Sequence, residues 1–536
     1  KMLQKYSCPL WHLTIFTLLF IHSTLESQIP SKFIQRDLLL DRTNMPRNIL
    51  AASALGGGSH LGPMTEILKI LMDLAPGNFT ANSYSYRSIP QVIVDKETTI
   101  GLFNKDLVKK LYFEHSKITS LNAMFDPDFY TKNYKIFKQT AMEINADLFI
   151  CDIVMNFPCF DLAWELEKPV VGITFTSLFS IPSPSYKSDP MYGCRVNMEN
   201  ESFYERFNCA IVKPLKFLWM YMAMRNDLNN QRTKLGIENY WNPRARLDNI
   251  LLLYDTFFGF EIPSAMLPLH QQIGPILPDT YPNLTPDLDS FLNTHPRTMY
   301  FALGSQVFTS PKNTAILLKS FIKLINQNII DGVIWAIVKT NVTELMPFSN
   351  VDFPISDILN NNYPHIHITK FAPQFAILSH ENTKVFLSHG GAASSHESIY
   401  TATSSHESIY TATPMLVLPI LGDQFGNAEK LEMAGMALRL SKFNLTFDET
   451  VLKIRRLLSE ESFKKNAERL QFVAKMNSKR KYRAADLIEM VMNSVKYDGI
   501  KDENGNLKIN NKALLRDWIT PDTRMGFIRG NYIDVY

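Results

Sequence analysis

Short apolar runs alternate with longer stretches of helical periodicity along most of this 536-residue chain. Such alternation is typical of α/β proteins, in which helices connect parallel strands. A first apolar run at 48–53 leads into a glycine-rich turn at 56–60. After Pro63, apolar residues recur every three or four positions, which predicts a helix. In the first half of the chain we therefore expect strands at 48–53, 91–94, 147–152 and 169–173.

A proline-rich stretch then interrupts the pattern. Four prolines, Pro275, Pro278, Pro282 and Pro286, fall within twelve residues, which is a linker composition. Beyond it the alternation restarts, with strands expected at 298–305, 332–337, 385–388 and 414–419. Two successive strand–helix sets predict two Rossmann-like domains that face each other across a cleft, with ligands at the carboxyl ends of the strands.

The first 27 residues have the shape of a signal peptide, because Lys1 and Lys5 precede an apolar run too short to span a bilayer comfortably. A buried helix of the first domain is the alternative interpretation. We assign the rest of the chain to an N-terminal domain at 34–275, a linker at 276–292, a C-terminal domain at 293–459 and a group of helices at 460–536.

A signal peptide implies the secretory pathway, with the protein in the endoplasmic reticulum lumen or secreted. Glycosylation triplets fit a glycoprotein, although each triplet also arises by chance; they begin at Asn78, Asn200, Asn283, Asn341 and Asn444. The last residues, 530–536, have an apolar tendency, so we expect membrane association if the native chain continues into an anchor.

Composition narrows the function classes. A content of 46% hydrophobic and 20% charged residues is globular, and a net charge of +3 gives no reason to expect nucleic acid as a partner. Aromatic residues at 12% suit a pocket for a lipophilic ligand, but large cores explain them as well.

Five cysteines are present, one of them, Cys8, inside the signal segment. Cys194 and Cys209 bracket a polar stretch and are candidates for a disulfide, whereas Cys151 and Cys159 lie in apolar surroundings and are expected to be buried thiols. No cysteine–histidine spacing suggests a metal site, and we expect no cofactor.

The strongest chemical signal is a turn in the second half, His389-Gly390-Gly391, between an expected strand and an expected helix. Glycines let backbone N–H groups approach an anion, and the helix N-terminus adds partial positive charge, which together suit a diphosphate. Such a turn is more often purely structural. Ser305, after another strand, can supply a second contact, and Glu397 can accept hydrogen bonds from two ribose hydroxyls.

The order of these residues carries more weight than any one of them. The series runs from Phe371 and Gln374 through His389, Gly390, Gly391, Ser394 and Glu397 to Asp423 and Gln424. It resembles the UDP-binding signature of the UDP-glycosyltransferase family of glycosyltransferase family 1, which has the GT-B fold. A further likeness is the linker tripeptide Ile273-Gly274-Pro275.

The resemblance implies a role for each residue of the series. His389 and the backbone of Gly390 and Gly391, assisted by Ser305, would bind the diphosphate, and Ser394 would belong to the same UDP-sugar site. Glu397 would bind the ribose, and Asp423 with Gln424 the transferred sugar. Phe371, where the family usually has Trp, would stack on uracil beside Gln374.

A ten-residue duplication lies inside this signature. Residues 394–403 are repeated without change as 404–413, which indicates a recent duplication or a sequence-assembly error. His389 and Asp423 are 34 residues apart, where the family has about 24, and removing one copy restores 24. Glu397 keeps the correct distance to His389, but Glu407 keeps the correct distance to Asp423 and competes for the ribose role.

The N-terminal half has a second motif, Gly57-Gly58-Ser59-His60 followed by Gly62-Pro63. It is similar to the family's catalytic-histidine turn. Attack by an acceptor hydroxyl needs a base, which suits a histidine, and an acid behind the ring fixes its tautomer. Asp152, at the end of an expected strand, matches the partner position; Asp147 starts that strand and should be remote. Otherwise His60 is a capping or exposed turn residue.

The resemblance therefore implies inverting transfer of a hexose from a UDP-sugar to a hydroxyl of a small lipophilic acceptor. Glucose is the preferred sugar and glucuronic acid the alternative. The helix dipole and backbone N–H groups, not a metal, would stabilise departing UDP, and the C-terminal helices would pack back on the N-terminal domain. Two other interpretations stay open: a non-catalytic nucleotide-sugar binder impaired by the duplication, and another GT-B enzyme such as a sugar-nucleotide epimerase.

Overall fold

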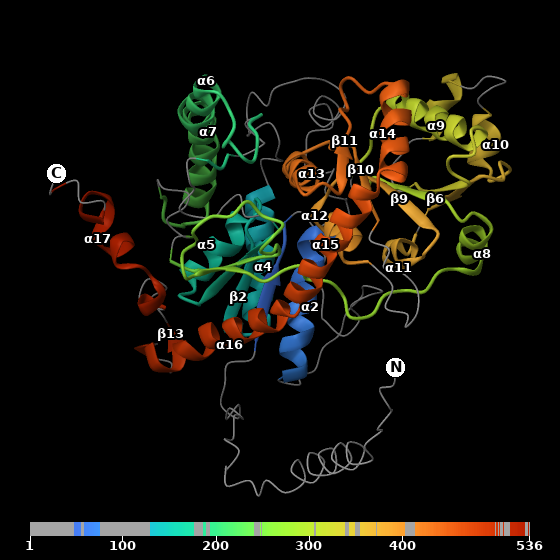
Figure 1. Cartoon of the computed structure of the whole chain (residues 1–536). Coiled ribbons are helices and arrows are strands. Elements are labelled where there is room, and N and C mark those ends of the chain that lie inside the picture. Colours follow the sequence, from blue (N-terminus) through green and yellow to red (C-terminus); the bar gives the residue numbers. More distant parts are fainter. Residues whose placement is uncertain are drawn as a thin grey trace, which may run out of the picture. The chain divides into compact units, whose positions relative to one another are not determined.

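A computed structural model describes the chain from Asn48 onward, with gaps. The described residues are 48–54, 58–74, 129–175, 186–188, 193–240, 247, 249–304, 307–337, 342–348, 354–370, 372–401, 413–498, 500–501, 503, 507–508, 515–530 and 534. They belong to one compact unit built on two parallel sheets (Figure 1). The α/β architecture expected from the alternating pattern is confirmed.

The first sheet contains five described strands in chain order, all parallel. They are β1 (Ile49–Ala52), β2 (Leu148–Asp152), β3 (Val170–Thr174), β4 (Leu251–Tyr254) and β5 (His270–Gln272). Every residue of β2, β3 and β4 is buried, because helices cover both faces of a parallel sheet. Strands β1, β2 and β3 match the apolar runs, and the strand expected at 91–94 lies outside the described residues.

Six helical segments of the first half are described. They are α2 (Gly58–Leu74), α4 (Phe129–Glu143), α5 (Phe157–Glu165), α6 (Phe203–Phe207), the π-helical turn η5 (Asn208–Val212) and α7 (Lys213–Lys234). The expected start of α2 after Pro63 is wrong, since the helix already begins at Gly58. Pro63 is the sixth residue of α2 and lies inside the helix, so the helix continues past it although the ring removes one hydrogen bond of the helix.

The second sheet has the strand order β11-β10-β9-β6-β7-β8, also parallel. Its strands are β6 (Thr298–Ala302), β7 (Gly332–Ala336), β8 (Ile366–Thr369), β9 (Thr383–Ser388), β10 (Met415–Val417) and β11 (Ala437–Arg439). Successive strands run outward in one direction from β6 and in the other from β9. The carboxyl ends of these two adjacent strands therefore border the crevice where ligands bind in such sheets.

Helices surround the second sheet. The described ones are α8 (Pro286–Thr294), α9 (Pro311–Asn326), η6 (Val342–Phe348), α10 (Ile355–Leu359), α11 (Gln374–Ser379), α12 (Ala392–Tyr400), α13 (Gln424–Met433) and α14 (Phe447–Ser459). The first copy of the duplicated segment forms most of α12, and residues 402–412, which contain most of the second copy, lie outside the described residues.

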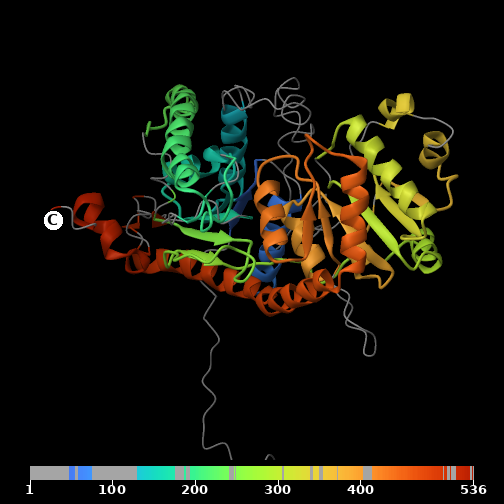
Figure 2. The same cartoon turned by 45° about the horizontal axis from the view of Figure 1, so that its top comes forward.

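The C-terminal helices connect the two cores. Helix α15 (Glu461–Ser478) places Ala467, Leu470 and Ala474 in the core beside α12, whereas α16 (Arg480–Asp498) packs against α2 in the core of the first sheet. Figure 2 shows these orange-to-red helices passing from the second sheet to the first. The chain continues through β12 (Ile500–Lys501), β13 (Leu507–Lys508), η7 (Arg516–Trp518) and α17 (Pro521–Gly530). The domain boundaries assigned from the sequence stay predictions.

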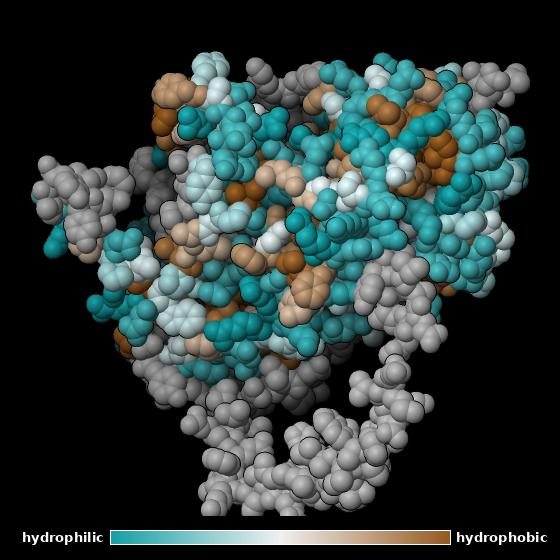
Figure 3. Space-filling model, in the orientation of Figure 1, coloured by the Kyte–Doolittle hydropathy of each residue, from teal (hydrophilic) through white to brown (hydrophobic). Residues whose placement is uncertain are grey.

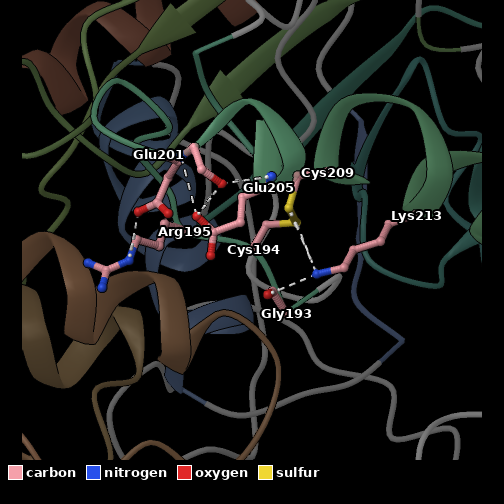
Figure 4. Close-up of a disulfide and its surroundings, with 8 residues drawn as sticks. Gly193, Cys194, Arg195, Glu201, Glu205, Cys209 and Lys213 are labelled. Carbon is pink, nitrogen blue, oxygen red and sulfur yellow. Dashed lines mark hydrogen bonds and ion pairs between the residues drawn. A yellow bond between two sulfur atoms is a disulfide. The ribbon is translucent and has the colours of Figure 1, made fainter. Parts of the chain in front are cut away.

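Two disulfides are present among the described cysteines. The bond between Cys194 and Cys209 confirms the expected candidate and ties η5 to the loop before α6 (Figure 4). The expectation of free thiols at Cys151 and Cys159 is wrong, because these two residues also form a disulfide. Both are fully buried, as their apolar surroundings indicated. The sequence did not show that the end of β2 and the start of α5 bring their Cα atoms to 5.9 Å.

Three glycosylation triplets fall on described residues, and their asparagines, Asn200, Asn283 and Asn444, are exposed. Asn78 and Asn341 lie outside the described residues. None of the described helices is long and apolar enough to cross a membrane.

A buried ion pair fixes the helices that cover the first sheet. Arg232 on α7 donates from Nε to Asp161 on α5 over 2.6 Å, and both side chains are at most 1% exposed. The hydroxyl of Tyr130 donates to the same carboxylate oxygen over 2.6 Å. Because a buried charge is stable only when it is paired, this contact holds α5, which directly follows the end of β2.

We expect Asp161→Asn to lower the free energy of unfolding by about 3 kcal/mol or more, because it leaves the guanidinium buried without a counter-charge. The matched control is Glu165→Gln, one turn further along α5. Glu165 pairs with Lys138, and the two side chains are 34% and 40% exposed, so its loss should cost about 0.5 kcal/mol or less. Denaturant unfolding at neutral pH measures both, and equal losses would contradict the assignment.

Candidate active site

The imidazole of His60 and the carboxylate of Asp152 meet at the carboxyl edge of the first sheet. His60 lies in the first turn of α2 and Asp152 is the last residue of β2. Nδ1 of His60 is 2.7 Å from Oδ2 of Asp152, whose side chain is 2% exposed. An ionised carboxylate only accepts, so Nδ1 carries the proton and donates it. Nε2 is then the ring nitrogen that can accept a proton.

Two further donors hold the carboxylate of Asp152 in place. The hydroxyl of Ser53, just after β1, donates to Oδ2 over 3.1 Å, and the backbone N–H of Val154 donates to Oδ1 over 3.1 Å. Asp147, at the opposite end of β2, accepts instead from the backbone N–H of Asn48 over 3.0 Å. The structure thus brings Asp152 to His60 and keeps Asp147 apart from it.

The charge around His60 comes from both halves of the chain. Burial lowers the pKa of His60, but Asp152, through its charge and its hydrogen bond, and Asp423 raise it, so the net pKa lies above the ordinary value. The ring of Phe175 packs edge-on, with the centroids 4.7 Å apart. Next to His60, the hydroxyl of Ser59 accepts from the backbone N–H of Ala393 over 3.3 Å, so α2 and α12 meet at their N-termini.

His389 follows β9 at the crevice between β6 and β9, and glycines make room for its ring. A Cβ on Gly304 would lie 2.7 Å from its Cε1, and a Cβ on Gly391 would lie 2.4 Å from its Nε2. Gly390 also has a φ of +80°, which side chains rarely adopt. These positions therefore require glycine, and the turn leads directly into the N-terminus of α12.

Burial gives His389 a specific chemical state. It lowers the pKa of His389 to about 4, so the ring is neutral at physiological pH. Its Nδ1 is buried and has no hydrogen-bond partner among the described residues. A neutral imidazole with an unpaired nitrogen, beside glycine N–H groups and a helix N-terminus, can bind an anion without bringing a full positive charge.

Asp423 is linked to the same turn. It precedes α13, and Asn427, one turn into the helix, donates from Nδ2 to Oδ2 of Asp423 over 2.8 Å and to the carbonyl oxygen of Gly390 over 3.0 Å. Burial raises the pKa of Asp423 to about 6, although His60 and Lys430 oppose the shift. Oε1 of Gln424 accepts from the backbone N–H groups of Ile420 and Leu421, so its side chain holds the loop that precedes α13.

Gln374, Ser394 and Glu397 form a third group. Nε2 of Gln374 donates to Oε2 of Glu397 over 2.6 Å and to the hydroxyl of Ser394 over 3.2 Å. Burial raises the pKa of Glu397 to about 7, and the hydrogen bond from Gln374 opposes this. Ser305, Phe371 and the competing Glu407 lie outside the described residues.

Sequence reasoning missed several contacts of this site. Ser53, Phe175 and Asn427 were not assigned roles, yet each touches a residue that was. The pairing of β1 with β2 would have located Ser53, because Ala52 lies opposite Cys151 and the next residues of both strands must be neighbours. Among the described residues no group of three or more His, Cys, Asp and Glu side chains is arranged to hold a metal ion.

Comparison with known proteins agrees with this geometry. The family model described as "UDP-glucoronosyl and UDP-glucosyl transferase" matches residues 180–496. A UDP-glycosyltransferase from Talaromyces amestolkiae is 28% identical over 522 residues, covering 91% of this chain and 94% of its own. UDP-glucuronosyltransferase 1A6 from Oryctolagus cuniculus is 29% identical over 227 residues, covering 42% and 36%.

Solved structures show the same fold at low sequence identity. A UDP-glucosyltransferase from Polygonum tinctorium superposes with a TM-score of 0.54 and 16% identity, covering 84% of this chain and 100% of its own. UGT2 from Phytolacca americana gives a TM-score of 0.52 and 15% identity, covering 83% and 99%. The fold is therefore GT-B, as expected. Because the family model spans more than half of the chain, this protein belongs to the UDP-glucoronosyl and UDP-glucosyl transferase family and is a glycosyltransferase that takes its sugar from a UDP-sugar.

Proposed function

We propose that the protein transfers a hexose, glucose by preference, to a hydroxyl of a small lipophilic acceptor, with inversion at the anomeric carbon. The observation that carries this proposal is the 2.7 Å contact between His60 and Asp152, at a point where the charge of Asp423 from the other half acts on the imidazole. A base oriented by a buried acid thus stands opposite a group suited to sugar hydroxyls.

The reaction follows from this geometry as a single displacement. Asp152 fixes Nδ1–H, so Nε2 of His60 removes the proton of the acceptor hydroxyl while its oxygen attacks the anomeric carbon. The bond from that carbon to the diphosphate oxygen breaks, and its electron pair leaves with UDP. Asp152 stabilises the imidazolium that forms. Attack from the face opposite to UDP inverts the configuration.

The donor side supplies binding and stabilises the leaving group. In this proposal the turn at His389, Gly390 and Gly391, at the N-terminus of α12, receives the diphosphate, Glu397 the ribose and Asp423 the sugar. Ser305 and Phe371 keep their proposed diphosphate and uracil contacts as sequence predictions. Independence from a metal also stays a prediction.

The names of similar proteins support the substrate classes. The Polygonum tinctorium enzyme is described as glucosylating indoxyl, and the Phytolacca americana structure contains UDP-2fluoro-glucose and pterostilbene. Both names combine glucose with a small aromatic molecule, which is the reason to place glucose first. Relatives named as glucuronosyltransferases keep glucuronic acid as the second candidate sugar.

The duplication leaves the described donor residues in contact. Glu397 of the first copy is bonded to Gln374, and the hydroxyl of Ser398 donates to the carbonyl oxygen of Thr413, just before β10. These donor contacts suit an enzyme and a non-catalytic binder alike, and it is the contact of His60 with Asp152 that favours the enzyme.

Location in the secretory pathway and membrane association also remain proposals. The continuous helix α6–η5–α7 exposes large apolar residues at spacings of three or four, which places them along one stripe. They are Tyr204, Phe207, Ile211, Leu215, Leu218, Trp219 and Met222, with Phe203 beside them. Figure 3 shows brown and tan side chains at the edge where α6 and α7 lie. Exposed Arg206 and Lys216 accompany the stripe. Aromatic and basic residues together suit an anionic lipid surface.

We expect His60→Ala and Asp152→Asn each to lower sugar transfer by about 100-fold or more, because the acceptor loses its base or the base loses its tautomer. The assay is product mass after incubation with a panel of UDP-sugars and lipophilic alcohols. The control is Asp147→Asn at the other end of the strand, which should transfer at the normal rate. Normal transfer by the His60 variant would remove its assigned role.

We expect the KM for the UDP-sugar to fall as the pH rises from about 6 to 8. The pKa of Glu397 is about 7 and that of Asp423 about 6, so both carboxyls lose protons over this range and become better acceptors for sugar hydroxyls. The diester diphosphate of a UDP-sugar does not titrate there.

The duplicated segment provides the matched control for this prediction. Glu397→Gln should raise the KM by about 10-fold or more, the cost of losing hydrogen bonds to a charged group, and should flatten the step near pH 7. Glu407→Gln should leave both unchanged. The reverse result would move the ribose contact to the second copy.

We expect the protein to co-sediment with vesicles that contain anionic lipid and to lose this binding when Tyr204 and Trp219 are both changed to Ser. Trp219 is 76% exposed, so the change removes contact with the lipid without opening the core. Sugar transfer to a water-soluble acceptor is the control and should not change. Binding that survives the double substitution would rule out this helix as the contact.

A further inference from the structure

A segment of the first half packs into the core of the second. After β4 the chain forms Asp255–Glu261, here called the crossover segment. The rings of Phe257 and Phe260 are almost completely buried in the hydrophobic cluster that contains residues of α12, α13 and α15. The ring of His396 on α12 lies within 5.9 and 6.1 Å of these two rings, centroid to centroid, and its Nδ1 is 3.7 Å from Oδ1 of Asp255.

The same segment is fixed to the first half by the tripeptide Ile273-Gly274-Pro275 and the residue that follows it. The backbone N–H of Gly274 donates to the carbonyl oxygen of Thr256 over 2.9 Å, and that of Ile276 donates to Oδ1 of Asp255 over 2.8 Å. A Cβ on Gly274 would lie 2.6 Å from the backbone nitrogen of Thr256. The close approach requires glycine, which gives the tripeptide Ile273-Gly274-Pro275 a structural reason.

At its end the crossover segment carries a buried ion pair with the donor side. Nζ of Lys430 on α13 donates to Oε1 of Glu261 over 2.6 Å, and the two side chains are 4% and 3% exposed. The hydroxyl of Thr256 donates to the same oxygen over 2.9 Å, and the ammonium lies 5.3 Å from the centre of the Phe260 ring. A buried ammonium with these partners has one stable position, because any displacement leaves a charge unpaired.

Helix geometry connects this pair to the sugar site. Asp423 and Lys430 are seven residues apart, about two turns and about 10 Å along α13, and therefore share one face. Asn427 lies between them and joins Asp423 to the carbonyl oxygen of Gly390. One face of α13 thus carries the proposed sugar contact, the link to the diphosphate turn and the anchor to the first half.

We propose that Glu261 and Lys430 are positioning residues of the transfer reaction, which hold α13 so that Asp423 presents the donor sugar to His60. The proposal rests on the proposed function, because it gives Asp423 and His60 their roles. The proposal gives neither Glu261 nor Lys430 a contact with a substrate, because their side chains are 3% and 4% exposed and paired with each other. They contribute by fixing the distance between the sugar held by Asp423 and the imidazole of His60, because the rate of a displacement reaction is sensitive to this distance.

The test compares chemistry with nucleotide binding. Glu261→Asp keeps the charge but shortens the side chain, Glu261→Gln removes the charge, and Lys430→Met removes the partner. For each, kcat is measured with UDP-glucose and one accepted alcohol, and UDP affinity by calorimetry. We expect each single variant to lower kcat about 10-fold or more, with UDP affinity within about threefold of the original protein. The kcat of the double variant Glu261→Gln, Lys430→Met should not fall below the kcat of the less active of the two single variants, because both substitutions remove the same interaction.

The matched control is another ion pair on the same helix. Glu432 bonds Nε of Arg439 over 2.6 Å, and both side chains are 35% exposed, so Glu432→Gln should leave kcat and UDP affinity unchanged. An unchanged kcat in all three Glu261 and Lys430 variants would overturn the proposal. So would a parallel loss of UDP affinity, kcat and melting temperature, because a purely structural role predicts it. Glu261→Asp keeps the negative charge beside Lys430 while it shortens the side chain, and it supplies the result if the other variants do not fold.

A failure of the proposed function is distinguishable from a failure of this proposal. An unaltered protein that binds UDP but transfers no sugar would contradict the proposed function. The role of the ion pair in holding α13 is then measured by amide hydrogen exchange without substrate. Glu261→Asp and Glu261→Gln should each exchange the amides of residues 424–433 faster than Glu432→Gln does. Exchange at the same rate in all variants would contradict the anchoring role.

Discussion

The imidazole proposed to activate the acceptor and the carboxylate proposed to hold the sugar belong to different sheets, so the proposed reaction depends on contacts that cross between the halves. Those contacts are of three kinds: the hydrogen bond between Ser59 and Ala393 beside the imidazole, the apolar insertion of Phe257 and Phe260, and the buried pair of Glu261 and Lys430. The burial of the two rings stabilises the association of the halves but does not fix their relative orientation, because the hydrophobic effect is non-directional. The polar contacts add the direction that a displacement reaction needs.

Burial also sets the charges of the proposed donor site. His389 is held neutral, whereas the pKa values of Glu397 and Asp423 are raised to about 7 and 6. Each of these groups lacks the solvation it would have in water and gains from a ligand that supplies hydrogen bonds. A diphosphate and sugar hydroxyls provide such partners. Burial makes the charged carboxylates unfavourable when they lack partners. It therefore favours the binding of a UDP-sugar, whose hydroxyls donate hydrogen bonds to them.

Local patterns were sufficient for most of the framework. Apolar runs located β1, β2, β3, β6, β7, β9 and β10, because buried parallel strands read as continuous hydrophobic segments. Strand β5, His-Gln-Gln, has no such run, and its pairing with β4 decides its structure. The disulfide of Cys151 with Cys159 was missed because apolar context predicts burial but not the distance between two sulfur atoms. Site residues were found through the order of a known signature; Glu261 and Lys430, 169 residues apart, have no local pattern that links them.

The central claim is that the base of one half faces the anomeric carbon held by the other. The most direct measurement is a crystal structure of the protein with a non-reactive UDP-2-fluoro sugar. The account predicts the anomeric carbon within about 6 Å of Nε2 of His60, the upper limit set by one hydrogen bond and one attack distance, with the diphosphate on the opposite side of the sugar. An imidazole turned away from the sugar, or separated from the anomeric carbon by about twice that distance, would contradict the account.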